Sequence, residues 1–199
     1  MEHKKQKPEK RWYALYTRSR WEKKIHEALL EKGIESYLPL QKILKQWSDR
    51  RKWVEEPLIR SYVFVRIYKK DYPEPLKTDG VVTFVKTAGE MSPVQDKEIE
   101  ILKIISGSGE QVEVTTEDFK KGDPVEVISG KMKGLYGTLV QHRGKHQVMI
   151  RIEAIDQNLM INIPVIHLKK TKSWVVERKK RKQWEMSEEV KKTNYLFVF

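Results

Sequence analysis

Residues 57–67 read PLIRSYVFVRI and contain four consecutive large apolar residues, from Tyr62 to Val65. Because side chains alternate along a strand, Tyr62 and Phe64 are expected on one face and Val63 and Val65 on the other. A strand that is apolar on both faces is either covered on both sides or keeps one face for a partner. The alternation alone leaves both possibilities open for Tyr62 and Phe64.

The sequence before this run predicts a strand followed by a helix. Residues 12–17, WYALYT, are aromatic and apolar, which is typical of a strand. Ser19 is expected to begin the helix, because Glu22 lies three residues later and can complete a capping box. Gly33 is expected to end it in a left-handed conformation. The apolar stripe of this helix consists of Trp21, Ile25, Ala28 and Leu29.

A second strand is predicted at residues 35–43, with Pro39 at an edge or a bend. A basic and aromatic stretch follows, and Asp49 marks the expected tip of a hairpin. Cationic side chains beside tryptophan suit phosphate contacts and base stacking. The alternative is a solvated hairpin whose two tryptophans fold onto the core. The residues concerned are Lys42, Lys45, Trp47, Arg50, Arg51, Lys52 and Trp53.

After residue 67 the pattern alternates between short strands and helices. Residues 71–78 predict a short helix or loop broken by two prolines, and residues 81–86 predict a strand. Asp96 can cap a helix that is ended by the Gly-Ser-Gly at residues 107–109. This order implies a mainly antiparallel sheet with helices packed on it, so the predicted fold class of residues 11–109 is α+β.

From residue 119 onward, short strands are separated by frequent glycines. This pattern predicts a small, five-stranded SH3-like β-barrel over residues 119–170, joined to the first domain by an acidic linker at residues 110–118. A charged extension (residues 1–10) precedes the two domains. A basic tail (residues 171–199), helical or disordered, follows them. The expected barrel strands are Pro124–Ile128, Gly137–His142, Gln147–Ile152, Met160–Pro164 and Val165–Leu168.

The net charge of +12 is unevenly divided along the chain. It is +10 in residues 1–70, −7 in residues 71–118, +5 in residues 119–170 and +4 in residues 171–199. A basic surface attracts nucleic acid through counterion release. The alternative is a solvated lysine-rich surface.

Several classes of function are excluded or disfavoured by the composition. The chain has no cysteine, which excludes disulfides and thiolate zinc sites. The five histidines show no metal-ligand spacing, and no nucleophile or phosphate-loop motif is present. We therefore expect no enzyme activity, no cofactor and no metal. The charged N-terminus and the absence of a long apolar run predict a cytoplasmic protein without membrane contact, and we expect a monomer.

Two parts of the sequence resemble a known family. Residues 119–139, FKKGDPVEVISGKMKGLYGTL, resemble the KOW motif, which ribosomal proteins also carry. WYALYTRSRWEKKIHEALLEKGIESYLPL, PLIRSYVFVRI and DGVVTFVKTAGEMSPVQDKEIEIL together resemble the N-terminal domain of the NusG family. The resemblance is nearest to its specialised paralogues of the RfaH and UpxY type, which are antiterminators of surface-polysaccharide operons. It covers about residues 11–170.

This resemblance implies a transcription elongation and antitermination factor that docks on the β′ clamp helices of RNA polymerase and suppresses pausing. The positions that match the docking surface are Tyr16, Ile59, Tyr62 and Phe64. It therefore shifts Tyr62 and Phe64 from expected core residues to expected contact residues. Two rival functions remain open, a housekeeping NusG and a ribosome-associated KOW RNA-binding protein.

Two departures from the family pattern bear on these contacts. The family usually has proline before the small residue of the aromatic strand, whereas this chain has Arg60-Ser61. Arg60 either meets acidic residues on the clamp or is tolerated at a bend. Tyr68-Lys69-Lys70 stands where RfaH has the His-Thr-Thr that contacts the β-subunit gate loop, which puts that contact in doubt.

The resemblance also implies proximity to DNA. Arg18 matches a basic position that contacts the exposed non-template strand in RfaH, and the basic hairpin would lie toward upstream DNA. The expected nucleic-acid contacts are therefore Arg18, Lys42, Lys45, Arg50, Arg51 and Lys52, without base reading by either tryptophan. Rho or a small-subunit ribosomal protein is the expected class of partner for the KOW barrel.

Overall fold

The computed structural model describes residues 9–47, 50–116, 122–142 and 145–171. The chain divides into two compact units. The first comprises residues 1–118 together with residues 149–162, and the second comprises residues 119–148 together with residues 163–199. Residues 149–162, which the sequence assigns to the barrel, thus belong to the first unit. The expected tip residue Asp49 and the basic run at residues 178–182 lie outside the described residues.

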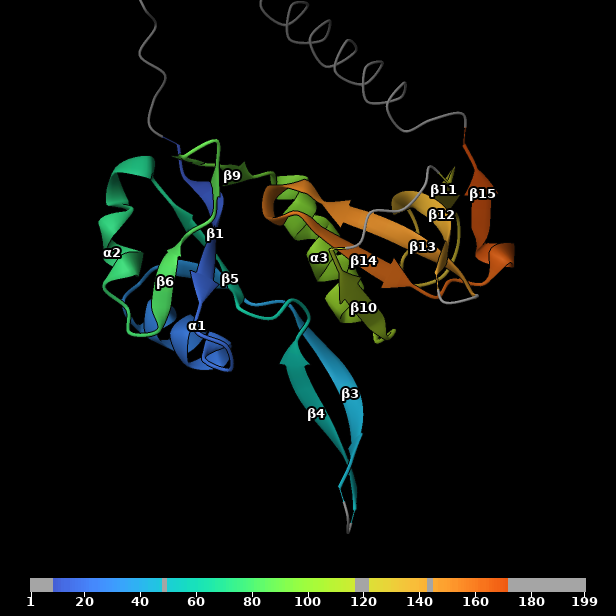
Figure 1. Cartoon of the computed structure of the whole chain (residues 1–199), viewed down its shortest axis with the longest axis horizontal. Helices are drawn as coiled ribbons and strands as arrows, with labels where there is room; N and C mark the ends of the chain where they lie inside the picture. Colours follow the sequence, from blue (N-terminus) through green and yellow to red (C-terminus); the bar gives the residue numbers. More distant parts are fainter. Residues whose placement is uncertain (1–8, 48–49, 117–121, 143–144, 172–199) are drawn as a thin grey trace, which may run out of the picture. The chain divides into compact units, whose positions relative to one another are not determined.

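The first unit contains a mixed α/β fold around an antiparallel sheet (Figure 1). The strand order is β2-β5-β1-β6, and β9 also pairs with β1. This arrangement confirms the predicted mainly antiparallel sheet. The strands are β1 (Arg11–Thr17), β2 (Glu35–Tyr37), β5 (Tyr62–Ile67), β6 (Val81–Phe84) and β9 (Pro93–Val94).

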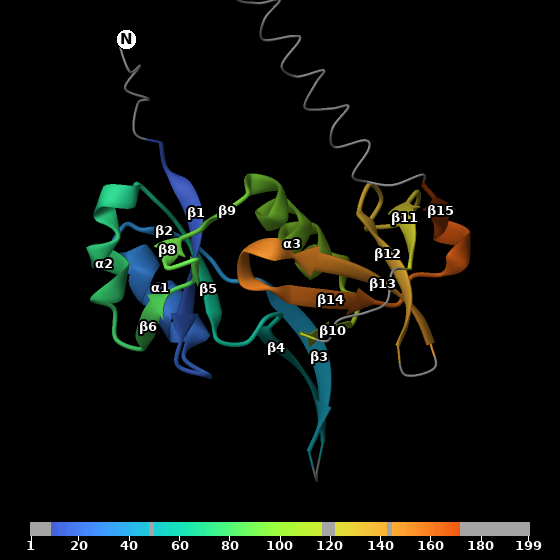
Figure 2. The ribbon, with the colours of Figure 1, turned by 45° about the horizontal axis from the view of Figure 1, so that its top comes forward.

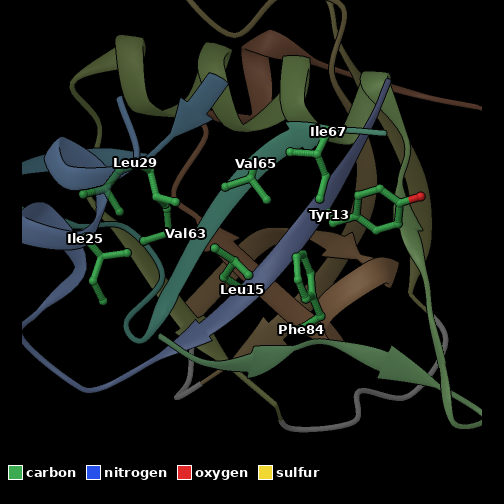
Figure 3. Close-up of a cluster of buried hydrophobic side chains, with 9 residues drawn as sticks. Tyr13, Leu15, Ile25, Leu29, Val63, Val65, Ile67 and Phe84 are labelled. Carbon is green, nitrogen blue, oxygen red and sulfur yellow. The ribbon is translucent and has the colours of Figure 1, made fainter. Parts of the chain in front are cut away.

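One face of this sheet is covered by α1 (Glu22–Glu31). Val63 and Val65 of β5 lie fully buried against Ile25 and Leu29 of the helix, and these side chains point toward one another (Figure 3). The predicted helical stripe and the predicted alternation along β5 therefore meet in one core. The other members of the cluster are Tyr13, Leu15, Leu38, Ile67 and Phe84.

The start of α1 differs from the sequence-based prediction. The helix begins at Glu22, and its cap residue Trp21 makes no side-chain capping bond. Glu22 is buried, and its carboxylate accepts a hydrogen bond of 2.7 Å from the backbone N–H of Ser61 instead of completing a capping box with Ser19. The predicted end is confirmed, because Gly33 adopts a left-handed φ of 72°.

The remaining elements of the first unit follow the predicted order. The broken segment at residues 71–78 forms the short helix α2 (Pro73–Leu76) after a 3-10 turn (Lys69–Asp71). The helix α3 (Asp96–Ser108) begins with a capping box between Gln95 and Glu98, one residue earlier than predicted, and ends at left-handed Gly109. A small hairpin lies between them, formed by β7 (Lys86–Thr87) and β8 (Glu90–Met91).

The C-terminal part of the chain is β-rich. Its sheet has six strands in the order β10-β14-β13-β12-β11-β15, one more than predicted. The additional strand β10 (Val112–Thr115) comes from the predicted linker, because Val112 and Val114 pair with β14. The predicted strand at Val165–Leu168 is instead a 3-10 helix (Val165–His167) followed by β15 (Leu168–Lys170). The other strands are β11 (Asp123–Val127), β12 (Tyr136–His142), β13 (Lys145–Ile152) and β14 (Gln157–Ile161).

Within the described residues, no helix combines the length and the apolar character that a membrane span requires.

Gly80 allows Trp21 to pack against the start of β6. Its φ is 89°, and a Cβ at this position would lie 2.7 Å from Cε3 of Trp21. We expect Gly80→Ala to lower the free energy of unfolding by about 2–4 kcal/mol, from backbone strain plus overpacking. Gly89→Ala is the matched control, because Gly89 has a φ of 84° with nothing within 4 Å of its Cβ position. Urea denaturation measures both, and equal losses would show that the Trp21 contact contributes nothing.

His26 links α1 to the sheet. Its Nδ1 lies 2.9 Å from Oγ of Ser36, and that hydroxyl donates to the carbonyl oxygen of Phe64 at 3.3 Å. Burial lowers the pKa of His26 below 6.5, although the nearby Glu27 carboxylate opposes this change. As the pH falls below 6.5 the unfolded chain therefore takes up the proton first, and the free energy of unfolding decreases. We expect His26→Gln to flatten this decrease between pH 7.5 and 5, in chemical denaturation across that range.

Candidate functional site

Two tyrosines form a partly exposed pair at one end of the main sheet. Tyr16 of β1 stands directly opposite Tyr62 of β5, on the face opposite to Leu15 and Val63. Their ring centroids are 5.6 Å apart with planes inclined at 69°, an edge-to-face arrangement. Tyr16 is 44% exposed, whereas Tyr62 is half-buried. The predicted contact residues Tyr16 and Tyr62 are thus brought together at the surface.

Ile59 and Phe64 are buried, contrary to the expectation that they face a partner. The ring of Phe64 packs against Tyr37 of β2 at 6.4 Å between centroids. Lys103 of α3 lies 5.7 Å from the centre of the Tyr37 ring. The face that carries Phe64 is therefore covered near β2, which the strand pattern could not show because Tyr37 and Lys103 are far from β5 in the sequence.

The backbone between Ile59 and Tyr62 bends at Ser61, which has a φ of 63°. Its N–H donates to buried Glu22 at 2.7 Å, and its carbonyl oxygen accepts from the N–H of Thr17 at 2.9 Å. Both bonds fix where β5 begins and hence where Tyr62 is held. Arg60 at the bend is well exposed, with its guanidinium 3.9 Å from a carboxylate oxygen of Glu56.

Glu98 and Asp156 are two residues near this region that sequence reasoning missed. Glu98 is buried; its Oε1 accepts from the N–H groups of Glu153 and Ala154 at 2.8 and 3.3 Å, and its Oε2 accepts from Gln95 at 3.0 Å. The pKa of Tyr62 is raised mainly by burial, and further by Tyr16 and by Asp156. The 3-10 turn at Glu153–Ile155 and Asp156 therefore adjoin α3 and the tyrosine pair within the first unit.

The basic and aromatic stretch forms the predicted hairpin. It consists of β3 (Leu40–Gln46) and β4 (Arg51–Pro57), which pair only with each other (Figure 2). The pairing places Leu44 opposite Trp53 and Lys45 opposite Lys52. Trp47 and Trp53 are 43% and 62% exposed, so the alternative in which they fold onto the core is wrong.

The cations of the hairpin fall into two groups. Lys42 lies 3.9 Å from Glu55, and Lys45, which is nearer the tip, forms an ion pair with Glu56 of the other strand. Near its tip, the Arg50 guanidinium lies 5.6 Å from the centre of the Trp47 ring, and Nε of Arg51 donates to the side chain of Gln46 at 3.0 Å. Toward the tip, Lys52 stands directly opposite Lys45.

Arg18 lies apart from the hairpin in the sequence, directly after β1. Its N–H donates to the carbonyl oxygen of Gly80 at 2.8 Å. Its guanidinium is 4.0 Å from Asp79 and 5.7 Å from the ring centre of Trp21, and the side chain is largely exposed. The residues predicted to bind nucleic acid therefore belong to two segments, the end of β1 and the hairpin.

The part of the chain that holds these features matches a known family. The family model "Transcription termination factor nusG" aligns with residues 10–103, a range that includes Tyr16, Tyr62 and the whole hairpin. The chain belongs to the NusG family. Among the described residues, no group of three or more His, Asp and Glu side chains could hold a metal ion.

Individual NusG proteins align over most of their length. A protein of Streptococcus pyogenes, "Transcription termination/antitermination protein NusG", is 28% identical over 145 residues, which cover 67% of this chain and 81% of that protein. The protein of the same name from Thermus thermophilus is 26% identical over 164 residues, covering 71% and 89%.

A solved structure of Thermotoga maritima NusG, titled "Domain interaction in Thermotoga maritima NusG", has the same fold. It superposes with a TM-score of 0.52 at 23% identity and covers 82% of this chain and 98% of its own. The α/β domain followed by a β-rich region is therefore the NusG-like arrangement expected from the KOW resemblance.

Glu98 provides a test of how the first unit of this NusG-family chain is held together. Its buried carboxylate accepts from three backbone N–H groups, and removing it takes away the acceptor of all three part-buried hydrogen bonds. We expect Glu98→Ala to lower the free energy of unfolding by about 2–4 kcal/mol. Glu100→Ala, an exposed position on the same helix, is the control and should change it by less than about 0.5 kcal/mol. Urea denaturation that gave the same midpoint for both variants would contradict this role.

Proposed function

We propose that this NusG-family chain is a transcription elongation and antitermination factor that docks on the β′ clamp helices of RNA polymerase. The observation that carries the proposal is the Tyr16–Tyr62 pair, which is held edge to face on the sheet and is partly exposed. Tyrosine combines a large apolar ring with a polar tip, and both suit a protein interface. A few such anchors contribute most of the binding free energy at many interfaces.

The supporting geometry argues for a pre-formed docking surface. Ser61 is fixed by Glu22 and Thr17, so little conformational entropy is lost when Tyr62 meets a partner. Ile59 and Phe64 lie beneath this surface and hold the strand in place. Exposed Arg60 lies two residues from Tyr62 and would complement acidic side chains on a clamp helix.

The same proposal gives the cations a role near DNA. Docking in the manner of the family would bring Arg18 and the hairpin residues Lys42, Lys45, Arg50, Arg51 and Lys52 toward upstream or non-template DNA. Lys42 and Lys45 are paired with glutamates, so we assign them a smaller share than Arg51 and Lys52. A factor that binds both polymerase and DNA would hold the clamp closed and suppress pausing.

Two versions of this function differ in scope. The resemblance to RfaH and UpxY favours a specialist for surface-polysaccharide operons, whereas the relatives that align carry the general NusG name. In the general version, the KOW region would recruit Rho or a small-subunit ribosomal protein. Chromosome-wide occupancy separates them, because a specialist occupies one or a few operons and a general factor occupies most transcribed genes.

Binding to polymerase tests the docking surface directly. We expect Tyr16→Ala/Tyr62→Ala to weaken binding of the isolated β′ clamp helices by more than about 30-fold, which corresponds to ~2 kcal/mol or more. Tyr72→Ala removes a similarly exposed tyrosine from the end of α2 and is the matched control. Phe64 is left intact, because truncating a buried ring would disturb the fold. Equal affinity of the double variant and the control would refute the assignment of this site.

A further inference from the structure

The hairpin formed by β3 and β4 carries three exposed apolar side chains that do not contribute to the buried core. The two strands pair only with each other, yet they place Trp53, Leu44 and Trp47 at the surface with 62%, 43% and 43% of each residue exposed. In Figures 1 and 2 the hairpin extends away from the main sheet of its own unit. An exposed tryptophan forgoes the favourable free energy of apolar burial. These rings therefore indicate contact with a partner molecule.

The register separates the hairpin into two faces. One face carries Trp53 opposite Leu44, and the next pair toward the tip on that face is Arg51 opposite Gln46. The hydrogen bond from Nε of Arg51 to Gln46, the residue opposite it, holds the guanidinium across this face of the hairpin. An aromatic ring and a positioned cation are therefore neighbours on one face, an arrangement that suits a base next to its phosphate.

On the other face of the hairpin, two lysines repel each other in the isolated protein. Lys45 and Lys52 stand directly opposite each other, and like charges at such positions destabilise a strand pair. Glu56 offsets the charge of Lys45, whereas Lys52 has no ion pair within the described residues. Next to this pair, the Arg50 guanidinium lies 5.6 Å from the ring centre of Trp47. A polyanion along this edge would remove the repulsion.

We propose that this hairpin binds single-stranded DNA, with a base stacked on Trp53, the adjacent phosphate held by Arg51 on the same face, and a further phosphate held by Lys52 from the other face. A strand with free bases satisfies both the ring and the cations, whereas a duplex offers phosphates but no accessible base faces. An apolar protein partner would offer no anionic group to Arg51 and Lys52. The proposal deepens the proposed function and rests on it for the choice of DNA over RNA. It differs from the sequence-based expectation, in which neither tryptophan took part.

The test uses the full chain without polymerase, with fluorescein-labelled oligo(dT) of 15 nucleotides followed by fluorescence anisotropy. We expect Trp53→Ala to weaken binding by about 5- to 150-fold and Trp53→Phe to retain most of the affinity. Tyr72→Ala, an exposed aromatic residue on another element, should bind as the wild type does. Because Trp53 is exposed, its removal should leave the circular dichroism spectrum unchanged.

Salt dependence tests the cations separately from the ring. Arg51→Gln and Lys52→Gln should each reduce the slope of log affinity against log salt by about 0.7, whereas Trp53→Ala should leave the slope unchanged. Wild-type affinity in Trp53→Ala would overturn the stacking role. Equal affinity for a 15-base-pair duplex would overturn single-strand binding, and tighter binding of oligo(rU) would overturn the choice of DNA.

Binding of the β′ clamp helices distinguishes failure of the stacking proposal from failure of the docking proposal. Trp53→Ala should bind the β′ clamp helices as well as the wild type does, because Trp53 lies on the hairpin and not on the main sheet that carries Tyr62. Loss of clamp binding in this variant would assign Trp53 to a protein interface and overturn the stacking role.

Discussion

Strand β5 has to be covered on both of its faces, because Val63, Phe64 and Val65 are large, apolar and consecutive. The antiparallel sheet satisfies one face with α1, which supplies Ile25 and Leu29. It satisfies the other face near β2, where Tyr37 packs on Phe64 and Lys103 of α3 lies over Tyr37. The two faces of this one strand are therefore covered by different parts of the chain.

The candidate docking surface lies at the end of β5 that is not covered on both faces. Tyr62 is the first residue of β5 and is only half-buried, and Tyr16 stands beside it at the end of β1. The bend at Ser61 is fixed by a buried carboxylate, so the two rings are positioned by the same elements that build the core. A surface supported in this way is small but rigid, which favours recognition by a few strong contacts.

The hairpin obeys a different constraint. It has no core of its own to bury, so its side chains are distributed by cross-strand pairing and by charge. Glutamates neutralise Lys42 and Lys45, and Arg50 lies beside the exposed ring of Trp47. The chain thus combines a rigid apolar platform with a basic, aromatic extension, and each is suited to a different kind of partner.

Local patterns in the sequence determined the helix α1, its end at Gly33, the strands β1 and β5, the hairpin and the approximate positions of β11 to β13. Periodicity and turn residues act over a few positions, so they can be recognised without the fold. The resemblance of two segments to a family added the order of the two regions. It also singled out Tyr16 and Tyr62.

Only the tertiary structure decided which apolar residues are accessible and which polar groups pair. It buried Ile59 and Phe64, exposed Trp53, and turned Glu22 from a helix cap into the partner of Ser61. It also placed a strand, β10, within the predicted linker, where it pairs with β14. The backbone N–H groups of residues 153 and 154 donate to Glu98. Each of these outcomes depends on a contact between residues that are far apart in the sequence, and the free energy of such contacts is set by packing and not by any local pattern.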